Sequence, residues 1–230
     1  MAGDTVEVMR FFDDSRGCEK FAQRVLRFGP GRSSARVDPE ADEVLFVLDG
    51  AATATSGDAE HRLEAGMGVF VGRGVSWSID AGGAGFEVLS VLVHDPEPGP
   101  DGTFAVVDLA REERRSATAA RQFVLGVTPE AGCASVTQFI GFVPPGRAPD
   151  HFHRYDEVLC ILEGEGVLHI GDEHEPFASG SCVHLPARLV HTLENTGAVE
   201  LRLVGVFRPA GSPAEAYYPD GTPATYPEGS

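Results

Sequence analysis

The sequence predicts an all-β protein made of two similar domains, each a β-sandwich or a β-barrel. The chain has 230 residues, enough for two domains of about 100 residues each. Its 28 Gly and 16 Pro are spread along the chain, as many turns between short strands would require. Short segments rich in Val, Leu, Ile and Phe alternate with turn signals such as DG, SGD and NTG. Short strands at regular spacing are typical of sandwiches and barrels.

An internal repeat supports the division into two domains. Residues 42–50 read DEVLFVLDG, and residues 156–164 read DEVLCILEG. The offset is 114 residues between Glu43 and Glu157, and it persists further along the chain. Two copies of a unit of this length predict two domains of the same fold.

Composition places the expected boundaries. We expect an N-terminal domain over residues 1–95 and a C-terminal domain over residues 103–208, joined by the Pro- and Gly-rich segment 95–102. The final stretch, 209–230, is also rich in Pro and Gly and predicts an irregular tail. The segment 109–121 departs from the β pattern, and its composition permits a short helix or an ordered loop.

Charge and hydropathy exclude several function classes. The formal net charge is −17, which repels phosphate backbones and anionic lipid surfaces, so we expect neither nucleic acid nor membrane as a partner. No apolar stretch approaches the roughly 20 residues that span a bilayer. The N-terminus lacks the features of a signal peptide, which predicts a cytoplasmic protein.

The cysteines predict no covalent framework. None of the four shows C-x-x-C spacing, so neither disulfides nor a zinc ribbon is expected. They are Cys18, Cys133, Cys160 and Cys182.

Histidines cluster in the second repeat. His151 and His153 are two residues apart, so on a strand both imidazoles project from one face. Glu157 can rejoin that face, and His191 follows a turn that would bring a later strand back against the first. Three imidazoles and one carboxylate suit Mn, Fe, Co, Ni, Cu or Zn better than Ca or Mg. Such a set leaves one or two coordination positions open for water or substrate.

Two stretches in this region resemble the characteristic motifs of the cupin superfamily. GRAPDHFHRYDEVLCILEGEG resembles the first motif, although the gap after Gly146 is four residues where the family usually has five. GSCVHLPARLVHTLEN resembles the second, although Arg188 stands where the family has Gly. The resemblance implies two tandem cupin (jelly-roll type) β-barrels and one divalent transition metal per chain, held by His151, His153, Glu157 and His191.

The first repeat lacks most of this ligand set. Glu43 matches Glu157, but Trp77 stands in place of His191, and the segment 36–40 has no histidine. We therefore expect a metal only in the C-terminal barrel. Trp77 is expected to fill the N-terminal cavity, and Glu43 to be a hydrogen-bonded remnant rather than a catalyst.

Strand parity predicts the walls of the C-terminal cavity. Residues that share parity with Glu157 or His191 should face the metal, whereas Cys160 should point away from it. The expected wall residues are Leu159, Ile161, Leu193 and Asn195.

Four further polar side chains lie near the expected site. Two of them have both a structural and a functional interpretation, and the other two have only a structural one. Arg188 is either a surface residue in a turn or the anchor of a substrate carboxylate, which guanidinium binds in a bidentate fork. His184 is either structural or a proton-transfer group. His169 and His174 lie on or near a turn and are expected to be solvated.

The resemblance implies two classes of function. The first is a metal-dependent enzyme acting on a small, carboxylate- or enol-bearing molecule, similar to cupin dioxygenases or oxalate decarboxylase. A non-redox isomerase or hydrolase of sugar acids, keto acids or small amides is the alternative. The second class is a non-catalytic binding or storage bicupin. Because paired barrels expose sheet edges, we expect a homodimer.

Overall fold

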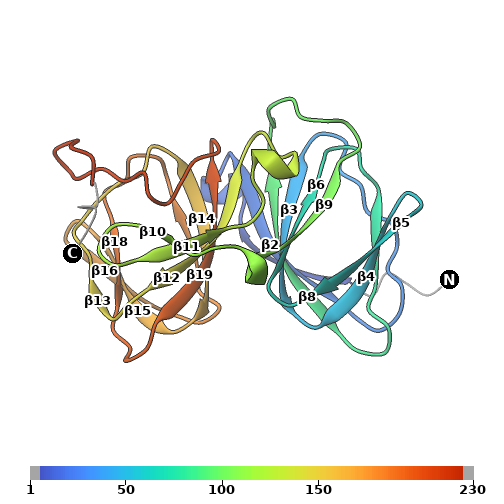
Figure 1. Cartoon of the computed structure of the whole chain (residues 1–230), viewed down its shortest axis with the longest axis horizontal. Helices are drawn as coiled ribbons and strands as arrows, with labels where there is room; N and C mark the ends of the chain where they lie inside the picture. The colour runs from blue at the N-terminus through green and yellow to red at the C-terminus, as the bar shows by residue number, and fades with distance from the viewer. Residues whose placement is uncertain (1–5, 225–230) are drawn as a thin grey trace. The chain divides into compact units, whose positions relative to one another are not determined.

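The structure, a computed structural model, describes residues 6–224, which divide into two compact units (Figure 1). Unit 1 comprises residues 6–111 and 126–136, and unit 2 comprises residues 112–125 and 137–224. Both are built almost entirely of antiparallel strands, which confirms the predicted all-β fold with two jelly-roll type β-barrels.

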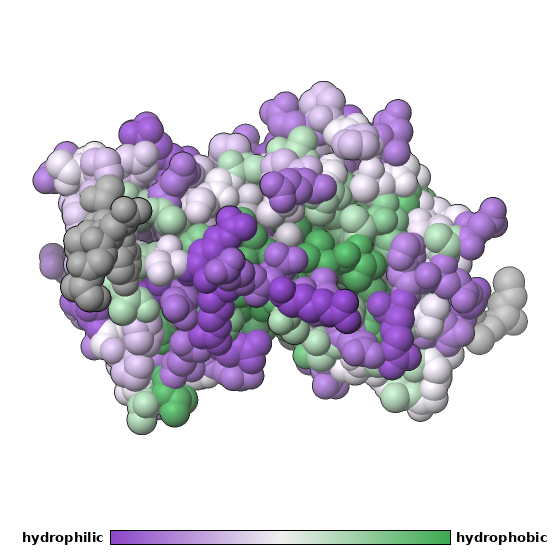
Figure 2. All heavy atoms as spheres, viewed as in Figure 1, coloured by the Kyte–Doolittle hydropathy of each residue, from purple (hydrophilic) through white to green (hydrophobic). Residues whose placement is uncertain are grey.

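No helix among the described residues is long and apolar enough to cross a membrane. On the face seen in Figure 2, hydrophilic side chains are spread over both units, in keeping with the net charge of −17.

Unit 1 is formed by two sheets. The larger has the strand order β1-β2-β8-β3-β6-β9, and the smaller has the order β5-β4-β7. The strands are β1 (Val6–Phe12), β2 (Phe21–Phe28), β3 (Asp42–Asp49), β4 (Ala51–Ser56), β5 (Ala59–Glu64), β6 (Met67–Val71), β7 (Trp77–Asp80), β8 (Phe86–Val93) and β9 (Phe104–Asp108).

Unit 2 repeats this plan. One sheet has the order β10-β11-β12-β19-β14-β17, and the other has the order β13-β18-β15-β16. The strands are β10 (Arg115–Ser116), β11 (Gln122–Leu125), β12 (Thr137–Val143), β13 (Gly146–Arg147), β14 (Asp156–Glu163), β15 (Glu165–Ile170), β16 (Glu173–Ala178), β17 (Cys182–Leu185), β18 (Thr192–Asn195) and β19 (Leu201–Arg208).

The sequence repeat is also a repeat of structure. β3 and β14 each pair with two antiparallel neighbours, β6 and β8 in unit 1 and β17 and β19 in unit 2. The register of β3 against β8 shifts at Val47/Asp49, and the register of β14 against β19 shifts at Ile161/Glu163, which are equivalent positions. The two units can therefore be compared residue by residue.

The boundary between the units differs from the expected one. β9 begins at residue 104 but pairs with β6, so it is an edge strand of unit 1. Residues 126–136 also belong to unit 1, although both flanking segments belong to unit 2. The Pro- and Gly-rich segment 95–102 is therefore a loop within unit 1, because the open edge of β6 accepts the strand that follows it.

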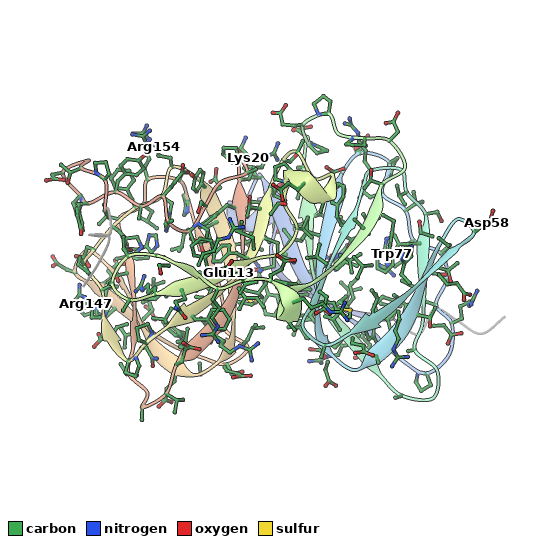
Figure 3. The ribbon with its side chains drawn as sticks, in the orientation of Figure 1. Lys20, Asp58, Trp77, Glu113, Arg147 and Arg154 are labelled. Atoms are coloured by element: carbon green, nitrogen blue, oxygen red, sulfur yellow. A yellow bond between two sulfur atoms is a disulfide. The ribbon has the colours of Figure 1, made fainter. Side chains whose placement is uncertain are left out.

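Trp77 fills the interior of unit 1, as the repeat predicted. Its side chain is 2% exposed and packs in a core with Leu26, Leu45 and Ile79 (Figure 3). Phe28 lies beside it, with ring centroids 6.2 Å apart.

The segment 109–121 is mainly an ordered loop, and its only helical part is one short 3-10 turn. A 3-10 turn over Leu109–Arg111 is followed by an extended chain and the hairpin between β10 and β11.

A disulfide joins Cys160 in β14 to Cys182 in β17, so the expectation of no disulfide was wrong. The two cysteines are directly opposite in the antiparallel register, with Cα atoms 4.1 Å apart. Their separation of 22 residues gives no local sequence signal, because strand pairing alone brings them together. Cys18 and Cys133 are buried and form no disulfide.

Candidate metal centre

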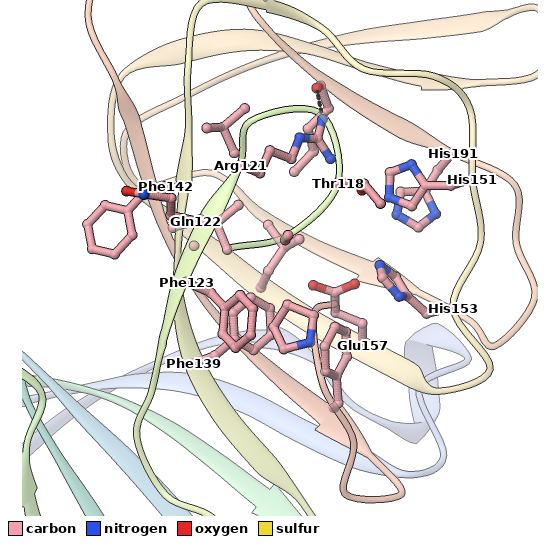
Figure 4. Close-up of a pocket in the computed structure, with 18 residues that line it drawn as sticks. Thr118, Arg121, Gln122, Phe123, Phe139, Phe142, His151, His153, Glu157 and His191 are labelled. Carbon is pink, nitrogen blue, oxygen red and sulfur yellow. Dashed lines mark hydrogen bonds between the residues drawn. The ribbon is translucent and has the colours of Figure 1, made fainter. Parts of the chain in front are cut away.

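Three histidines converge inside unit 2. His151 and His191 form an antiparallel bridge, in which each backbone N–H donates to the other's carbonyl at 3.0 and 2.8 Å. His153 is two residues beyond His151, so its ring joins the same face. One nitrogen from each ring lies within 4.8 Å of the other two, and all three side chains are buried (Figure 4).

Hydrogen bonds fix the tautomer of each imidazole. In all three rings Nδ1 lies within hydrogen-bond distance of a backbone carbonyl oxygen, which can only accept, so Nδ1 carries the proton. The Nε2 lone pairs are then free to bind a metal, the usual arrangement around metal-bound histidine. The acceptors are the carbonyl oxygens of Pro149 (3.0 Å from His151), Leu189 (2.8 Å from His191) and Glu215 (2.9 Å from His153).

The same environment keeps the rings neutral. Burial lowers the pKa of His151 to about 3 and that of His153 to about 4, and it also lowers the pKa of His191. All three rings are therefore uncharged at neutral pH, with Nε2 available as a ligand.

Glu157 brings a carboxylate to the same cavity. It lies in β14, its side chain is directed toward the histidines, and it is 5% exposed (Figure 4). No hydrogen bond or ion pair reaches this carboxylate from any residue between 6 and 224. Burial raises the pKa of Glu157 to about 8, against the opposing field of Arg121. A buried carboxylate without a partner is costly, so the site suits a cation.

The equivalent carboxylate in unit 1 has partners. Glu43 is also 5% exposed, but Arg24 Nη2 donates to its Oε1 at 3.0 Å and the hydroxyl of Ser90 donates to the same oxygen. This confirms the expectation that Glu43 is hydrogen-bonded.

Strand register identifies what replaces these partners in unit 2. Arg24 and Ser90 face each other across β2 and β8, and Phe139 and Gly205 face each other at the same positions of β12 and β19. The ring of Phe139 lies over Gly205, where a Cβ atom would be only 2.6 Å from one of its carbons and 3.3 Å from Glu157 Oε1. At these two positions unit 2 therefore supplies neither a cation nor a hydroxyl to its carboxylate.

The remaining cavity wall is mostly apolar. The cavity has a volume of about 70 Å³. Leu159 and Leu193 line it as parity predicted, whereas Ile161 belongs to the core and Asn195 does not line it. The amide of Asn195 donates instead to the carbonyls of Val143 and Val199, at 2.9 and 2.8 Å, and so fixes the end of β18.

Arg188 and His184 lie outside the cavity lining. Arg188 is exposed with a φ of 68°, and its backbone N–H donates to the carbonyl of His153 at 2.8 Å. The turn does adopt the left-handed conformation that Gly favours, which explains the Gly of the family pattern. His184 is opposite Val158 in register, whereas Leu185 is opposite Glu157, so His184 has the parity of the outer face. Partial burial lowers its pKa.

We expected both His169 and His174 to be solvated, and for His169 this was wrong. His169 is buried, with Nε2 2.7 Å from Glu194 Oε2 and Nδ1 3.0 Å from Nδ1 of His174. His174 alone is exposed. Neither lines the metal cavity.

Sequence reasoning missed two contributors to the site. Arg121 lines the cavity from the hairpin between β10 and β11, a segment that carried no pattern pointing to the histidines. Glu215 belongs to the segment expected to be an irregular tail, yet its carbonyl orients His153. Tyr217 of the same segment pairs with Phe152 through two backbone hydrogen bonds of 2.8 and 3.0 Å, which hold the tail against the site.

Comparisons with known proteins agree with this architecture. A family model described as "Cupin domain" matches residues 139–207, which include all four expected ligands. Auxin-binding protein 1 of Arabidopsis thaliana is 32% identical over 78 residues, covering 30% of this chain and 39% of that protein. Protein SchB of Streptomyces halstedii is 33% identical over 76 residues, covering 32% of this chain and 55% of that protein. The matches therefore span little more than half of these relatives at most.

A solved structure resembles the whole two-unit chain. Oxalate decarboxylase from Bacillus subtilis superposes with a TM-score of 0.74 at 14% identity, covering 91% of this chain and 74% of that chain. At this identity the likeness shows the fold alone.

Proposed function

Since this chain belongs to the cupin superfamily, we propose that the cavity of unit 2 is the active site of an enzyme. This enzyme would bind one divalent transition-metal ion and act on a small anionic molecule. The ligands would be Nε2 of His151, His153 and His191 and the carboxylate of Glu157. A bound ion would supply Lewis-acid or redox chemistry to a substrate oxygen.

One observation carries the proposal. A buried carboxylate that no residue between 6 and 224 pairs with lies beside three imidazoles whose Nε2 lone pairs are available, in a cavity with room for a further molecule. Unit 1 provides the comparison, because its equivalent carboxylate is neutralised by Arg24. The donor set, three imidazoles and one carboxylate, suits Mn, Fe, Co, Ni, Cu or Zn.

The protein's own groups would do the remaining work. The carbonyls bonded to Nδ1 hold the three rings in orientation, and the apolar wall excludes water from the reacting atoms. A doubly charged ion and one carboxylate leave the centre with a net positive charge, which favours an anionic substrate. Oxalate decarboxylase, which shares the fold, acts by its name on a small carboxylate, and our proposal extends that substrate class to this chain.

Metal content is the first test. Protein purified without added metal should contain about one transition-metal ion per chain by elemental analysis. His151→Ala and His191→Ala should lose that metal, whereas His169→Ala should keep it, because His169 is a buried histidine of the same barrel outside the cavity. Equal metal content in all three variants would rule out the site.

Turnover is the second test. The metal-loaded protein should consume dioxygen, release carbon dioxide or isomerise its substrate in a panel of phenols, keto acids and dicarboxylic acids. A chain that holds the metal but turns over none of them would instead support the binding or storage function.

A further inference from the structure

The cavity contains a cation, Arg121, that the metal site does not need. Arg121 ends a tight turn in which its N–H donates to the carbonyl of Thr118 at 3.3 Å and its carbonyl accepts from the N–H of Ala117 at 2.8 Å. Ala119 and Ala120 both have a φ of 57°. A positive φ at both central residues is the requirement of a type I′ turn, which Asn and Gly satisfy far better than alanine. The strained turn delivers Arg121 to the cavity.

The guanidinium is tethered but not neutralised. Nη2 donates to the carbonyl of Leu193 at 2.6 Å and lies 3.4 Å from Thr192 Oγ1, which ties Arg121 to β18 (Figure 4). Within residues 6–224 no carboxylate forms an ion pair with it, and Nε and Nη1 have no hydrogen-bond partner. Burial lowers its pKa to about 10, so it remains charged at neutral pH.

Arg121 faces the metal ligands across the cavity. It lines the same cavity as Glu157 and the three histidines, and Glu157 is the acidic residue whose field, when ionised, reaches it. If Glu157 binds a metal, most of that compensating field is cancelled. An unpaired charge in such a place favours an anion from outside the chain.

The other walls indicate the rest of the ligand. They are aromatic and aliphatic side chains, namely Phe123, Phe139, Leu159, Leu193, Leu203 and Phe207. Apart from the three histidines, Thr118 and Gln122 are the uncharged polar side chains among the lining residues. A ligand with one anionic end and an apolar body matches this surface, whereas a uniformly polar sugar acid would leave hydroxyls against apolar walls.

We propose that Arg121 determines specificity by binding the carboxylate of a small amphipathic acid, whose apolar body packs against the aromatic wall. The proposal rests on the proposed metal site as the neighbour of that acid, but not on any particular reaction. It moves the role of carboxylate anchor from Arg188, which is exposed outside the cavity, to a residue that lines it.

Calorimetric titration with three probes tests this proposal on metal-loaded protein. Benzoate carries both recognised features, benzamide lacks the charge, and acetate lacks the apolar body. Benzoate should bind more tightly than either of the others. Arg121→Gln should weaken benzoate binding roughly 10- to 100-fold, the loss expected for a charge-assisted hydrogen bond. Arg121→Lys should recover part of the affinity, since it keeps the charge but not the fork.

Two controls separate the possible failures. Arg147→Gln removes a surface arginine of the same barrel, paired with Asp150, and should leave benzoate binding unchanged. Metal content is measured for every variant, and Arg121→Gln should keep its metal. If wild type holds no metal, the proposed function fails, while benzoate binding and its dependence on Arg121 can still be measured in the metal-free chain.

Three results would overturn the role of Arg121. They are absence of benzoate binding by wild type at millimolar concentration, equal binding of benzoate and benzamide, and unchanged affinity in Arg121→Gln. A loss of benzoate affinity in Arg188→Gln but not in Arg121→Gln would return the anchor to Arg188.

Discussion

In metal-free protein, the substitution Glu157→Gln should stabilise the fold at neutral pH. Burial raises the pKa of Glu157 to about 8, from an ordinary value of 4.5. Between these values the folded state keeps a proton that the unfolded state has released. The contribution of Glu157 to the free energy of unfolding therefore falls as pH rises, by about 1.4 kcal/mol per pH unit. The stability that protonated Glu157 adds to the folded state is fully present below pH 4.5 and is lost as pH rises through about 8.

The expected magnitude at pH 7 follows from that slope. The interval from pH 4.5 to pH 7 spans about 2.5 pH units, so the free energy of unfolding of wild type at pH 7 should include a loss of about 3 kcal/mol from Glu157. Gln has nearly the same shape and no charge to desolvate, so the variant should escape this loss. The advantage should shrink toward zero near pH 4.5 and grow toward pH 8. With metal bound the sign should reverse, because wild type gains the binding free energy of its carboxylate ligand.

The equivalent residue of unit 1 supplies a matched control of opposite sign. Glu43 accepts from Arg24 at 3.0 Å, so Glu43→Gln should destabilise the metal-free protein by about 1–3 kcal/mol at pH 7 by leaving that cation without its carboxylate. Urea unfolding of the three proteins in a chelator, from pH 5 to 8, measures both effects. The reasoning fails if Glu157→Gln is no more stable than wild type at pH 7, or if its advantage does not change with pH.

Three further outcomes are expected. Gly205→Ala would place a methyl carbon in steric overlap with the Phe139 ring and should cost about 1–3 kcal/mol by urea unfolding, a cost that Phe139→Ala in the same chain should relieve. Below pH 6.5 the metal-free protein should lose stability in a pH series of thermal melts, because unfolded His151 takes up a proton that the folded state excludes until about pH 3. Replacing Ala119–Ala120 by Asn–Gly should raise the free energy of unfolding by about 1 kcal/mol, and a lower value would refute the I′ assignment.

The sequence was most informative where the pattern is local or repeated. The i, i+2 spacing of His151 and His153 fixes a shared face on any extended chain. The constant offset to Glu43 and Trp77 then indicates which unit lacks the expected ligands, without any knowledge of the barrel. Parity along β14 correctly placed Leu159 in the cavity.

The features that sequence reasoning missed depend on contacts between distant segments. Arg121 reaches the cavity because a hairpin thirty residues before the histidines packs over β18 through the carbonyl of Leu193. Cys160 meets Cys182 only after β14 pairs with β17. Glu215 acts through its backbone carbonyl, for which the identity of the side chain carries no signal.

The absence of the expected metal ligands alone does not explain the interior of unit 1. A bound ion would serve two purposes in such a barrel, since it occupies volume and balances the charge of the carboxylate. Trp77 replaces the volume, and Arg24 with Ser90 replaces the charge. Without Arg24, Glu43 would be a buried charge with no counter-charge, at a cost of several kcal/mol. Glu43 can therefore persist in unit 1 because Arg24 stands where unit 2 has Phe139, and Glu157 is free to bind a cation because unit 2 has no such arginine.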